Sequence, residues 1–286
     1  MTEKELCTLI TTALKVRENI LKMSTAGGAF TGASFSCVDL LVYLYSRFLN
    51  VSPSNLADPN RDYLFLSKGH AVPALYCTLA EMGILDGERL KNHLTTADAI
   101  YWHPNRSVPG VEFHSGSLGH ILSVATGVAL DCKLRGSRNI VVAILGDGEL
   151  NEGSNWEACL FAAARNLDNL IIVVDRNRFQ ANVRTERLVP LDPLEDKFNS
   201  FRLSAVTTDG HYFPDIEETF SRVPFDLGRP SVVIAETIRG KGLADLESRA
   251  DRWFCNFTET EIAGYLDELR SSTGRELTRT ATGAGL

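Results

Sequence analysis

Short apolar runs that end in polar loops constrain the fold of this chain most strongly. Residues 139–145 (NIVVAIL) and 170–175 (LIIVVD) are apolar at nearly every position. Runs of this kind are typical of strands with both faces buried, as in a parallel sheet covered by helices. Residues 202–208 and 231–237 are two further candidate strands, with a helix between them. The sequence therefore predicts an α/β fold with a parallel sheet flanked by helices.

Helical periodicity fills the segments before and between these strands. Apolar residues recur at roughly helical spacing over residues 3–23, and residues 37–49 form a second, strongly apolar segment. Further helices are expected at about 71–82, 118–134 and 155–165. Residues 271–286 are small and polar with little to bury, which predicts a flexible C-terminal tail.

Composition excludes several classes of protein. A net charge of -7 argues against nucleic-acid binding. No apolar run reaches the ~18 residues of a membrane-spanning helix, and the charged, amphipathic N-terminus lacks the apolar core of a secretion signal. The six cysteines are scattered without a CxxC pair and are interpreted as free or packed thiols. We expect a cytoplasmic protein with no membrane or nucleic-acid partner.

The loop after the strand at 139–145 carries a candidate metal and phosphate site. Its glycines, Gly146 and Gly148, let the backbone turn sharply around Asp147. The amides at the start of the following helix favour an anion, and a nearby carboxylate suits a divalent ion that bridges protein and phosphate. Asn177 follows the next strand, about one βαβ unit later, and can offer its amide oxygen to the same ion. The alternative is a plain turn at each position.

Several motifs in order along the chain resemble those of thiamine-diphosphate enzymes, and among these the diphosphate-binding half of transketolase. The family signature is GDG followed by Asn after the next strand, as at Asp147 and Asn177. The other matching segments are LSKGH (66–70), HP (103–104), PGVEFHSGSLGH (109–120), GDGELNEGSNWEA (146–158), DNLIIVVDRNRFQ (168–180), PLDPLEDKF (190–198), DGH (209–211) and TIRGKG (237–242). The resemblance implies one thiamine-diphosphate-binding domain of the PP-type fold over residues 1–270.

The resemblance also implies cofactor and metal ligands. Mg²⁺ would be held by Asp147, Asn177 and the backbone carbonyl of Phe179. The implied cofactor contacts come from the strand-end loops: His70, Gly116, Ser117, Leu118, Gly146, Gly148, Glu149, Asn177 and Arg239. His103 would face the substrate, and Glu152 would join the acidic network that couples two cofactors in a dimer. Each position also has a structural interpretation: His70 as a helix cap, His103 as a loop residue and Glu152 as a first-turn acid.

Three positions depart from the family pattern. Phe30 and Phe254 stand where the family usually has substrate-facing histidines, and His120 replaces a glutamine. A phenyl ring cannot pair with a sugar hydroxyl, which predicts a less hydroxylated or 2-oxo-acid-like substrate. Misalignment of these loops is the alternative.

A complete transketolase is more than twice as long and includes a pyrimidine-binding domain, which these residues cannot also form. The resemblance therefore implies the N-terminal subunit of a split transketolase with a separate C-terminal subunit, in an α2β2 assembly. Its implied activity is transfer of a two-carbon ketol unit from a ketose-like donor to an aldehyde. Two alternatives remain: a 2-oxo-acid decarboxylating or acyloin-forming enzyme subunit, and a non-catalytic regulatory subunit.

Overall fold

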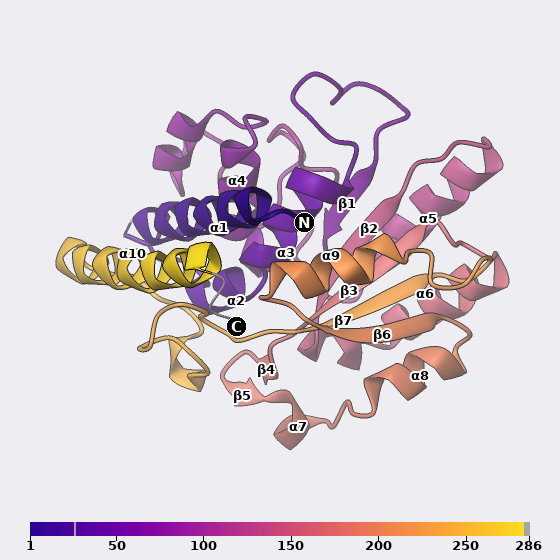
Figure 1. Ribbon diagram of the computed structural model, residues 1–286. Coiled ribbons are helices and arrows are strands. Elements are labelled where there is room, and N and C mark those ends of the chain that lie inside the picture. The colour runs from indigo at the N-terminus through magenta and orange to yellow at the C-terminus, as the bar shows by residue number, and fades with distance from the viewer. Residues whose placement is uncertain (26, 283–286) are drawn as a thin grey trace.

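Five parallel strands form the central sheet of the computed structural model, which describes residues 1–25 and 27–282. The strand order is β1-β2-β3-β7-β6 (Figure 1). The strands are β1 (Tyr63–Leu66), β2 (Val141–Gly146), β3 (Leu170–Arg176), β6 (Ser204–Asp209) and β7 (Ser231–Glu236). A separate two-stranded hairpin joins β4 (Phe179–Gln180) and β5 (Val183–Arg184). The predicted parallel sheet is confirmed.

Helices cover both faces of this sheet. On one face lie α1 (Glu3–Met23), α3 (Val38–Tyr43), α4 (Val72–Glu81), α9 (Phe213–Ser221) and α10 (Glu259–Thr282). The other face is covered by α5 (Ile121–Leu134), α6 (Gly153–Ala164) and α8 (Leu194–Ser200). The shorter helices are α2 (Thr31–Ser36), α7 (Thr185–Leu188), a π-turn (Leu44–Phe48) and 3₁₀ turns at Gly69–Ala71, Gly87–Asn92, Gly148–Asn151 and Ala250–Arg252.

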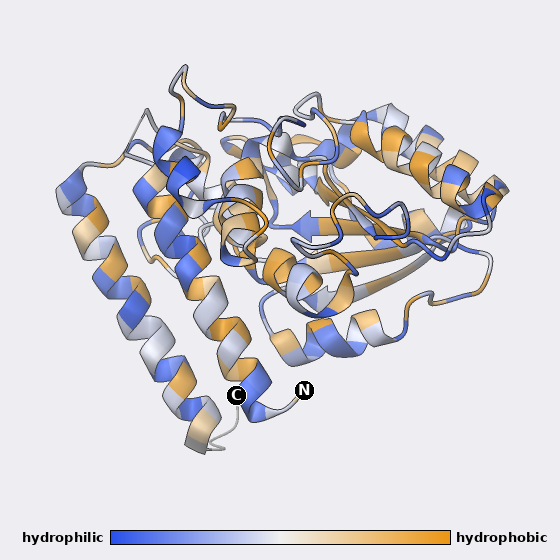
Figure 2. Cartoon of the chain, turned by 90° about the horizontal axis from the view of Figure 1, so that it is seen from above, coloured by the Kyte–Doolittle hydropathy of each residue, from blue (hydrophilic) through white to orange (hydrophobic). Residues whose placement is uncertain are grey.

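Alternation along the strands explains the continuous apolar runs. In β2, Val142 and Ile144 pack into the core beneath α1, α3 and α4. Val141, Ala143 and Leu145 point to the opposite side and pack with α5 and α6. Because both faces are buried, every position of the strand must be apolar. Figure 2 shows the strands as mostly hydrophobic between the two helical layers.

Two elements differ from the expectations. The single helix predicted over 37–49 is a short helix, α3, that continues into the π-turn Leu44–Phe48, and α2 ends just before it at Ser36. The strand β1 was not predicted, because only four residues of it are extended and its neighbours are polar. The other predicted helices and strands are present within a few residues of their expected bounds.

The predicted flexible tail is wrong for the residues that the structure describes. Residues 271–282 continue α10, which lies beside α1 (Figures 1 and 2). Leu269 is buried and Leu277 is half-buried against the core. The apolar surface of α1 gives these leucines a partner, which the composition of the segment alone does not reveal. Residues 283–286 of the predicted tail lie outside the described residues.

Among the described residues, no helix is long and apolar enough to cross a membrane. All six cysteines are free thiols, as predicted, and five of them are buried.

Candidate metal and diphosphate site

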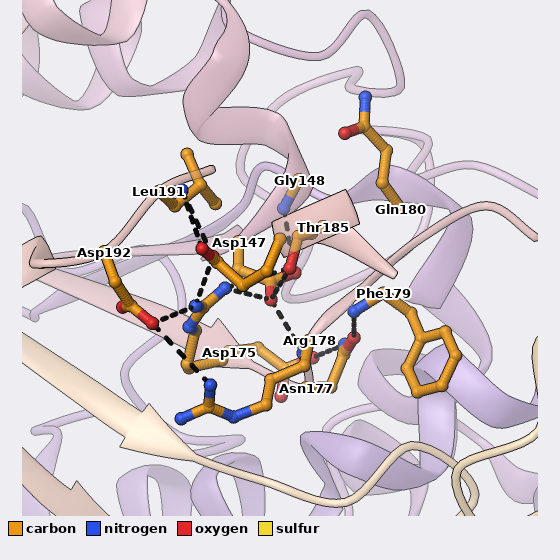
Figure 3. Close-up of polar contacts among 12 residues, drawn as sticks. Asp147, Gly148, Asp175, Asn177, Arg178, Phe179, Gln180, Thr185, Leu191 and Asp192 are labelled. Carbon is orange, nitrogen blue, oxygen red and sulfur yellow. Dashed lines mark hydrogen bonds and ion pairs between the residues drawn. The ribbon is translucent and has the colours of Figure 1, made fainter. Parts of the chain in front are cut away.

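The parallel register brings the loops after β2 and β3 together at one edge of the sheet. Gly146 at the end of β2 pairs with Asp175 of β3, and the backbone N–H of Asp147 donates to the Asp175 carbonyl at 3.3 Å. Asp147 and Asn177 therefore leave neighbouring strands at the same edge (Figure 3). In parallel sheets ligands bind beyond this edge, at the carboxyl ends of the strands.

The Asp147 carboxylate is fully buried and held at both oxygens. Oδ1 accepts one hydrogen bond, from the Gly148 N–H at 2.8 Å. Oδ2 accepts from the Arg178 N–H at 2.7 Å and from Arg176 Nη1 at 3.0 Å (Figure 3). Burial raises the pKa of Asp147 to about 6, against the lowering effect of Arg176. A cation at Oδ1, which has the fewer donors, would offset this cost of burying the charge.

The Asn177 side chain is oriented by its neighbours. Its Nδ2 donates to Asp175 Oδ2 at 2.8 Å, and its Oδ1 accepts from the Phe179 N–H at 3.0 Å. Since the amide nitrogen is committed to Asp175, the amide oxygen is the atom left to bind a cation through its second lone pair.

A buried ion pair supports this arrangement from below. Lys68 and Asp175 are at most 1% exposed, and Lys68 Nζ contacts Asp175 Oδ2. Hydroxyls of Ser36 at 2.6 Å and Thr237 at 2.5 Å also donate to Asp175. Burial would raise the pKa of Asp175, but Lys68 and the hydroxyl donors hold it below its usual value. The Asp175 carboxylate that orients Asn177 is thereby kept charged.

Arg176 is a site residue that the sequence analysis missed. It is fully buried, and its Nη1 lies 3.0 Å from both Asp147 Oδ2 and Thr185 Oγ1. Its Nη2 reaches Glu186 at 2.6 Å and Asp192 at 3.0 Å. Arg176 thus ties the candidate metal ligand to the loop after β5 (Figure 3). An arginine between a strand and its following asparagine carries no sequence signal for this position.

Glu149 points into the protein and ties three loops together. Its Oε1 accepts from Ser67 Oγ and from the Gly119 N–H at 2.9 Å, and its Oε2 accepts from the Gly146 N–H at 3.2 Å. Burial raises the pKa of Glu149 although these donors oppose it. The contacts describe a brace that sets the relative positions of the strand-end loops.

The loop at Gly116 packs closely on two other loops. A Cβ at Gly69 would lie 2.8 Å from Gly116 Cα, and a Cβ at Gly116, where φ is +137°, would lie 2.5 Å from His103 Cδ2. Both positions therefore require glycine. The contact places His103 against the turn that also carries Ser117 and Leu118.

The two candidate histidines of these loops are electrically neutral at neutral pH. Burial and the nearby Lys68 cation lower the pKa of His70 to about 3. Burial also lowers the pKa of His103, whose side chain is exposed at its outer edge. Neutral imidazoles can both donate and accept hydrogen bonds, so both remain able to bind oxygen atoms.

Arg239, after β7, is a buried cation with unused donors. It is 2% exposed, and its Nη1 donates to the Ala181 carbonyl at 2.5 Å. Its Nε and Nη2 have no hydrogen-bond partner within the described part of the chain. The guanidinium lies 5.1 Å from the centre of the Phe179 ring, beside the candidate metal loop. Burial lowers the pKa of Arg239 to about 10, so it stays charged and lacks only an anion.

Phe30 and Phe254 meet in an aromatic cluster next to His70. The Phe30 ring centre lies 5.1 Å from that of Phe254, 5.0 Å from Trp253 and 5.7 Å from His70. Trp102 adds a contact of 6.1 Å to Phe254. Phe254 and Trp102 are 41% and 40% exposed, so the cluster presents an apolar surface. The tryptophans were not predicted as part of it.

The remaining candidates lie at helix starts. Glu152 precedes α6 and is exposed, and its Cβ lies 2.6 Å from the position of a Cβ at Gly119. His120 precedes α5 and is exposed, with its Nδ1 donating to the Leu118 carbonyl at 3.1 Å.

The donor set of the site suits a hard cation with a phosphate. Across residues 1–25 and 27–282, no group of three or more His, Cys, Asp or Glu is arranged to bind a metal. The set at the strand ends contains one acid, one amide oxygen and main-chain carbonyls, which is typical of Mg²⁺ that completes its shell with phosphate oxygens and water. The unpartnered donors of Arg239 fit the phosphate side of such a pair.

Comparison with known proteins gives consistent matches. The model of the transketolase thiamine diphosphate binding domain matches residues 13–274. One of the two subunits of an apulose-4-phosphate transketolase from Actinobacillus succinogenes is 38% identical, and the match covers 90% of this chain and 94% of that protein. A 6-deoxy-6-sulfo-D-fructose transketolase subunit from a Clostridium species is 37% identical, and the match covers 85% of this chain and 89% of that protein.

Longer proteins match over part of their length only. Human transketolase is 30% identical over 86% of this chain but 40% of its own length. The crystal structure of transketolase from Campylobacter jejuni has a TM-score of 0.83 and 26% identity, and the match covers 96% of this chain and 43% of that one.

Proposed function

We propose that this chain, which belongs to the transketolase family as its thiamine diphosphate binding domain, is the Mg²⁺- and diphosphate-anchoring subunit of a two-component transketolase. The proposed reaction moves a two-carbon ketol unit from a ketose-like donor to an aldehyde. The observation that carries the proposal is the pairing of two buried groups around one loop. Asp147 is a buried carboxylate with a raised pKa, and Arg239 is a buried cation with two unpartnered donors.

The chain's own residues divide the work of anchoring. Asp147, the oriented amide oxygen of Asn177 and the carbonyl of Phe179 would hold Mg²⁺. Arg239 would bind diphosphate oxygens through Nε and Nη2, with the Gly148 backbone and His70 beside them. When bound, thiamine diphosphate supplies the nucleophilic carbon that allows a carbon–carbon bond next to a carbonyl to break and re-form.

Neutral histidines suit the substrate side of this site. His103, partly exposed against the turn at Gly116, would donate to or accept from substrate oxygens without carrying a charge. The backbone of residues 116–118 would contact the cofactor's aminopyrimidine ring. Glu152, exposed at the start of α6, would reach the acidic network between two cofactor sites.

A separate subunit completes the proposed enzyme. The two relatives at 37–38% identity are named as subunits, and this chain spans most of each. It spans less than half of human or C. jejuni transketolase. We therefore propose a C-terminal-type partner that carries the pyrimidine-binding domain, in an α2β2 assembly. The test is reconstitution: the chain with this partner, Mg²⁺ and thiamine diphosphate transfers a ketol unit, and the chain alone does not.

The aromatic cluster favours a substrate with few hydroxyls near it, which also keeps a 2-oxo-acid donor as the second candidate. Phe30 and Phe254 offer no hydrogen bond to a sugar hydroxyl. A hydroxyl placed against them would lose its water without gaining a partner.

We expect the double variant Phe30→His/Phe254→His to shift donor preference toward the more hydroxylated compound. The matched donors are erythrulose and 1,3-dihydroxybutan-2-one, which lacks only the terminal hydroxyl. The ratio of kcat/KM for these two donors should rise by about 10-fold or more, because each newly paired hydroxyl is worth ~1–3 kcal/mol. Phe161→His, on exposed α6, is the control and should leave the ratio unchanged. An unchanged ratio in the double variant would remove both rings from the substrate site.

A further inference from the structure

We propose that His211 is a positioning residue that holds the loop carrying Arg239 in the diphosphate site. This inference rests on the proposed function, because it concerns the same anchoring arginine. His211 follows β6, and its imidazole is bound at both nitrogens. The Ile238 N–H donates to Nε2 at 2.8 Å, and Nδ1 lies 2.7 Å from Asp39 Oδ2.

These two contacts fix the tautomer of the ring. Because the Ile238 N–H is a donor, Nε2 must be the unprotonated acceptor, and the single ring proton sits on Nδ1 facing Asp39. A neutral His211 therefore connects the loop after β7 to the carboxylate of Asp39 in α3.

Asp39 is itself locked in place by Arg17 of α1. Arg17 Nη1 donates to Oδ1 at 3.0 Å and Nη2 to Oδ2 at 2.7 Å, and both side chains are buried. Burial would raise the pKa of Asp39, but Arg17 and His211 hold it well below its usual value. The anchor for His211 is thus a permanently charged pair between two packed helices.

The hydrogen bond from Ile238 acts directly before Arg239. It fixes the peptide from which Arg239 leaves the backbone. The other ties of this loop lie at or after the arginine: the Arg239 carbonyl accepts from the Ser248 N–H at 2.9 Å, and the Gly240 N–H donates to the Gly32 carbonyl at 3.0 Å.

The loop has room to shift if this bond is lost. A cavity of about 310 Å³ lies on one side of His211 and an open groove of about 700 Å³ on the other, and both are lined by His211 and Lys241. Loss of the acceptor leaves the Ile238 N–H unpaired, and the space lets the loop move to rehydrate it. Arg239 would move with it.

Two variants separate the roles of the ring nitrogens. His211→Asn keeps a donor for Asp39 but is too short to accept from Ile238. His211→Gln places an amide oxygen near the former Nε2 and restores the acceptor. With the complete heteromer, we expect His211→Asn to weaken thiamine diphosphate binding in the presence of Mg²⁺ by about 10-fold, and His211→Gln by much less.

Trypsin gives a readout that does not depend on activity. The Arg239–Gly240 bond is a trypsin site whose arginine is buried. Cleavage there, followed by mass spectrometry on the chain alone, should be about 10-fold faster in His211→Asn than in the wild type or in His211→Gln. Cleavage at exposed Lys91 should be equal in all three and serves as the internal reference.

A double variant tests whether His211 acts through Arg239. If it does, His211→Asn adds nothing to the loss of cofactor affinity caused by Arg239→Gln. Additive losses, or an unchanged cleavage rate at Arg239 in His211→Asn, overturn the inference and leave the proposed function standing. A wild-type heteromer that binds no thiamine diphosphate overturns both. A loss in His211→Asn that His211→Gln restores, absent in the Arg239→Gln background, supports the inference.

Discussion

Asp147→Asn should weaken thiamine diphosphate binding to the heteromer in the presence of Mg²⁺ by on the order of 100-fold or more. The substitution keeps the shape and removes the one carboxylate of the proposed metal site. Asparagine can still accept from the Gly148 N–H, so the loop itself should persist. The measurement is a titration of the cofactor at saturating Mg²⁺, read by calorimetry.

Stability should move differently from affinity in this variant. Burial raises the pKa of Asp147 to about 6, above its ordinary value of 3.8. A carboxyl with a raised pKa contributes most to folding when it is protonated, and it loses that contribution as the pH rises through 6. At pH 7 to 8 the charged group therefore costs stability without a cation, and Asp147→Asn should not lower the melting temperature of the cation-free chain.

The matched control is Glu186→Gln, which also removes a carboxylate from Arg176. Glu186 is outside the proposed metal ligands, so its variant should keep cofactor affinity within about 10-fold of the wild type. Equal losses in the two variants would mean that Asp147 serves only to pair Arg176.

Lys68→Met should destabilise the folded chain by about 3–5 kcal/mol, because it leaves the Asp175 carboxylate buried without its cation. A loss of this size is a large part of the ~5–15 kcal/mol by which domains are stable. The measurement is chemical denaturation followed by circular dichroism. Asn177 should also lose its fixed orientation, since Asp175 accepts from its amide nitrogen.

Lys91→Met supplies the comparison for Lys68. Lys91 pairs with Glu88, but both side chains are more than 70% exposed, so the change should be below about 1 kcal/mol. The double variant Lys68→Met/Asp175→Asn should recover part of the lost stability, because it removes the unpaired charge. A Lys68→Met chain within 1 kcal/mol of the wild type would contradict this account of the ion pair.

The predictable part of the fold is the part set by local pattern. The runs at 139–145 and 170–175 are apolar because both strand faces are buried, and this one fact gives the sheet, its parallel order and the edge where ligands bind. The meeting of Asp147 and Asn177 at that edge follows from the same argument.

Long-range pairing accounts for what the sequence did not reveal. Lys68 and Asp175 are 107 positions apart, and no local pattern marks them as a pair. His211 gains its partners from α3 and from the loop after β7. The end of α10 is helical because α1 covers its leucines, although its own composition favours a tail. Each of these depends on which elements are neighbours in space.

Reconstitution tests the central claim most directly. The chain would be combined with a C-terminal-type transketolase subunit, Mg²⁺ and thiamine diphosphate, and offered a ketose phosphate or a 2-oxo acid, each with an aldose phosphate. The account predicts a product two carbons longer than the acceptor, formed from the ketose and lost when either subunit, the metal or the cofactor is omitted. Product from the 2-oxo acid alone, with release of CO₂, or equal activity without this chain, would contradict it.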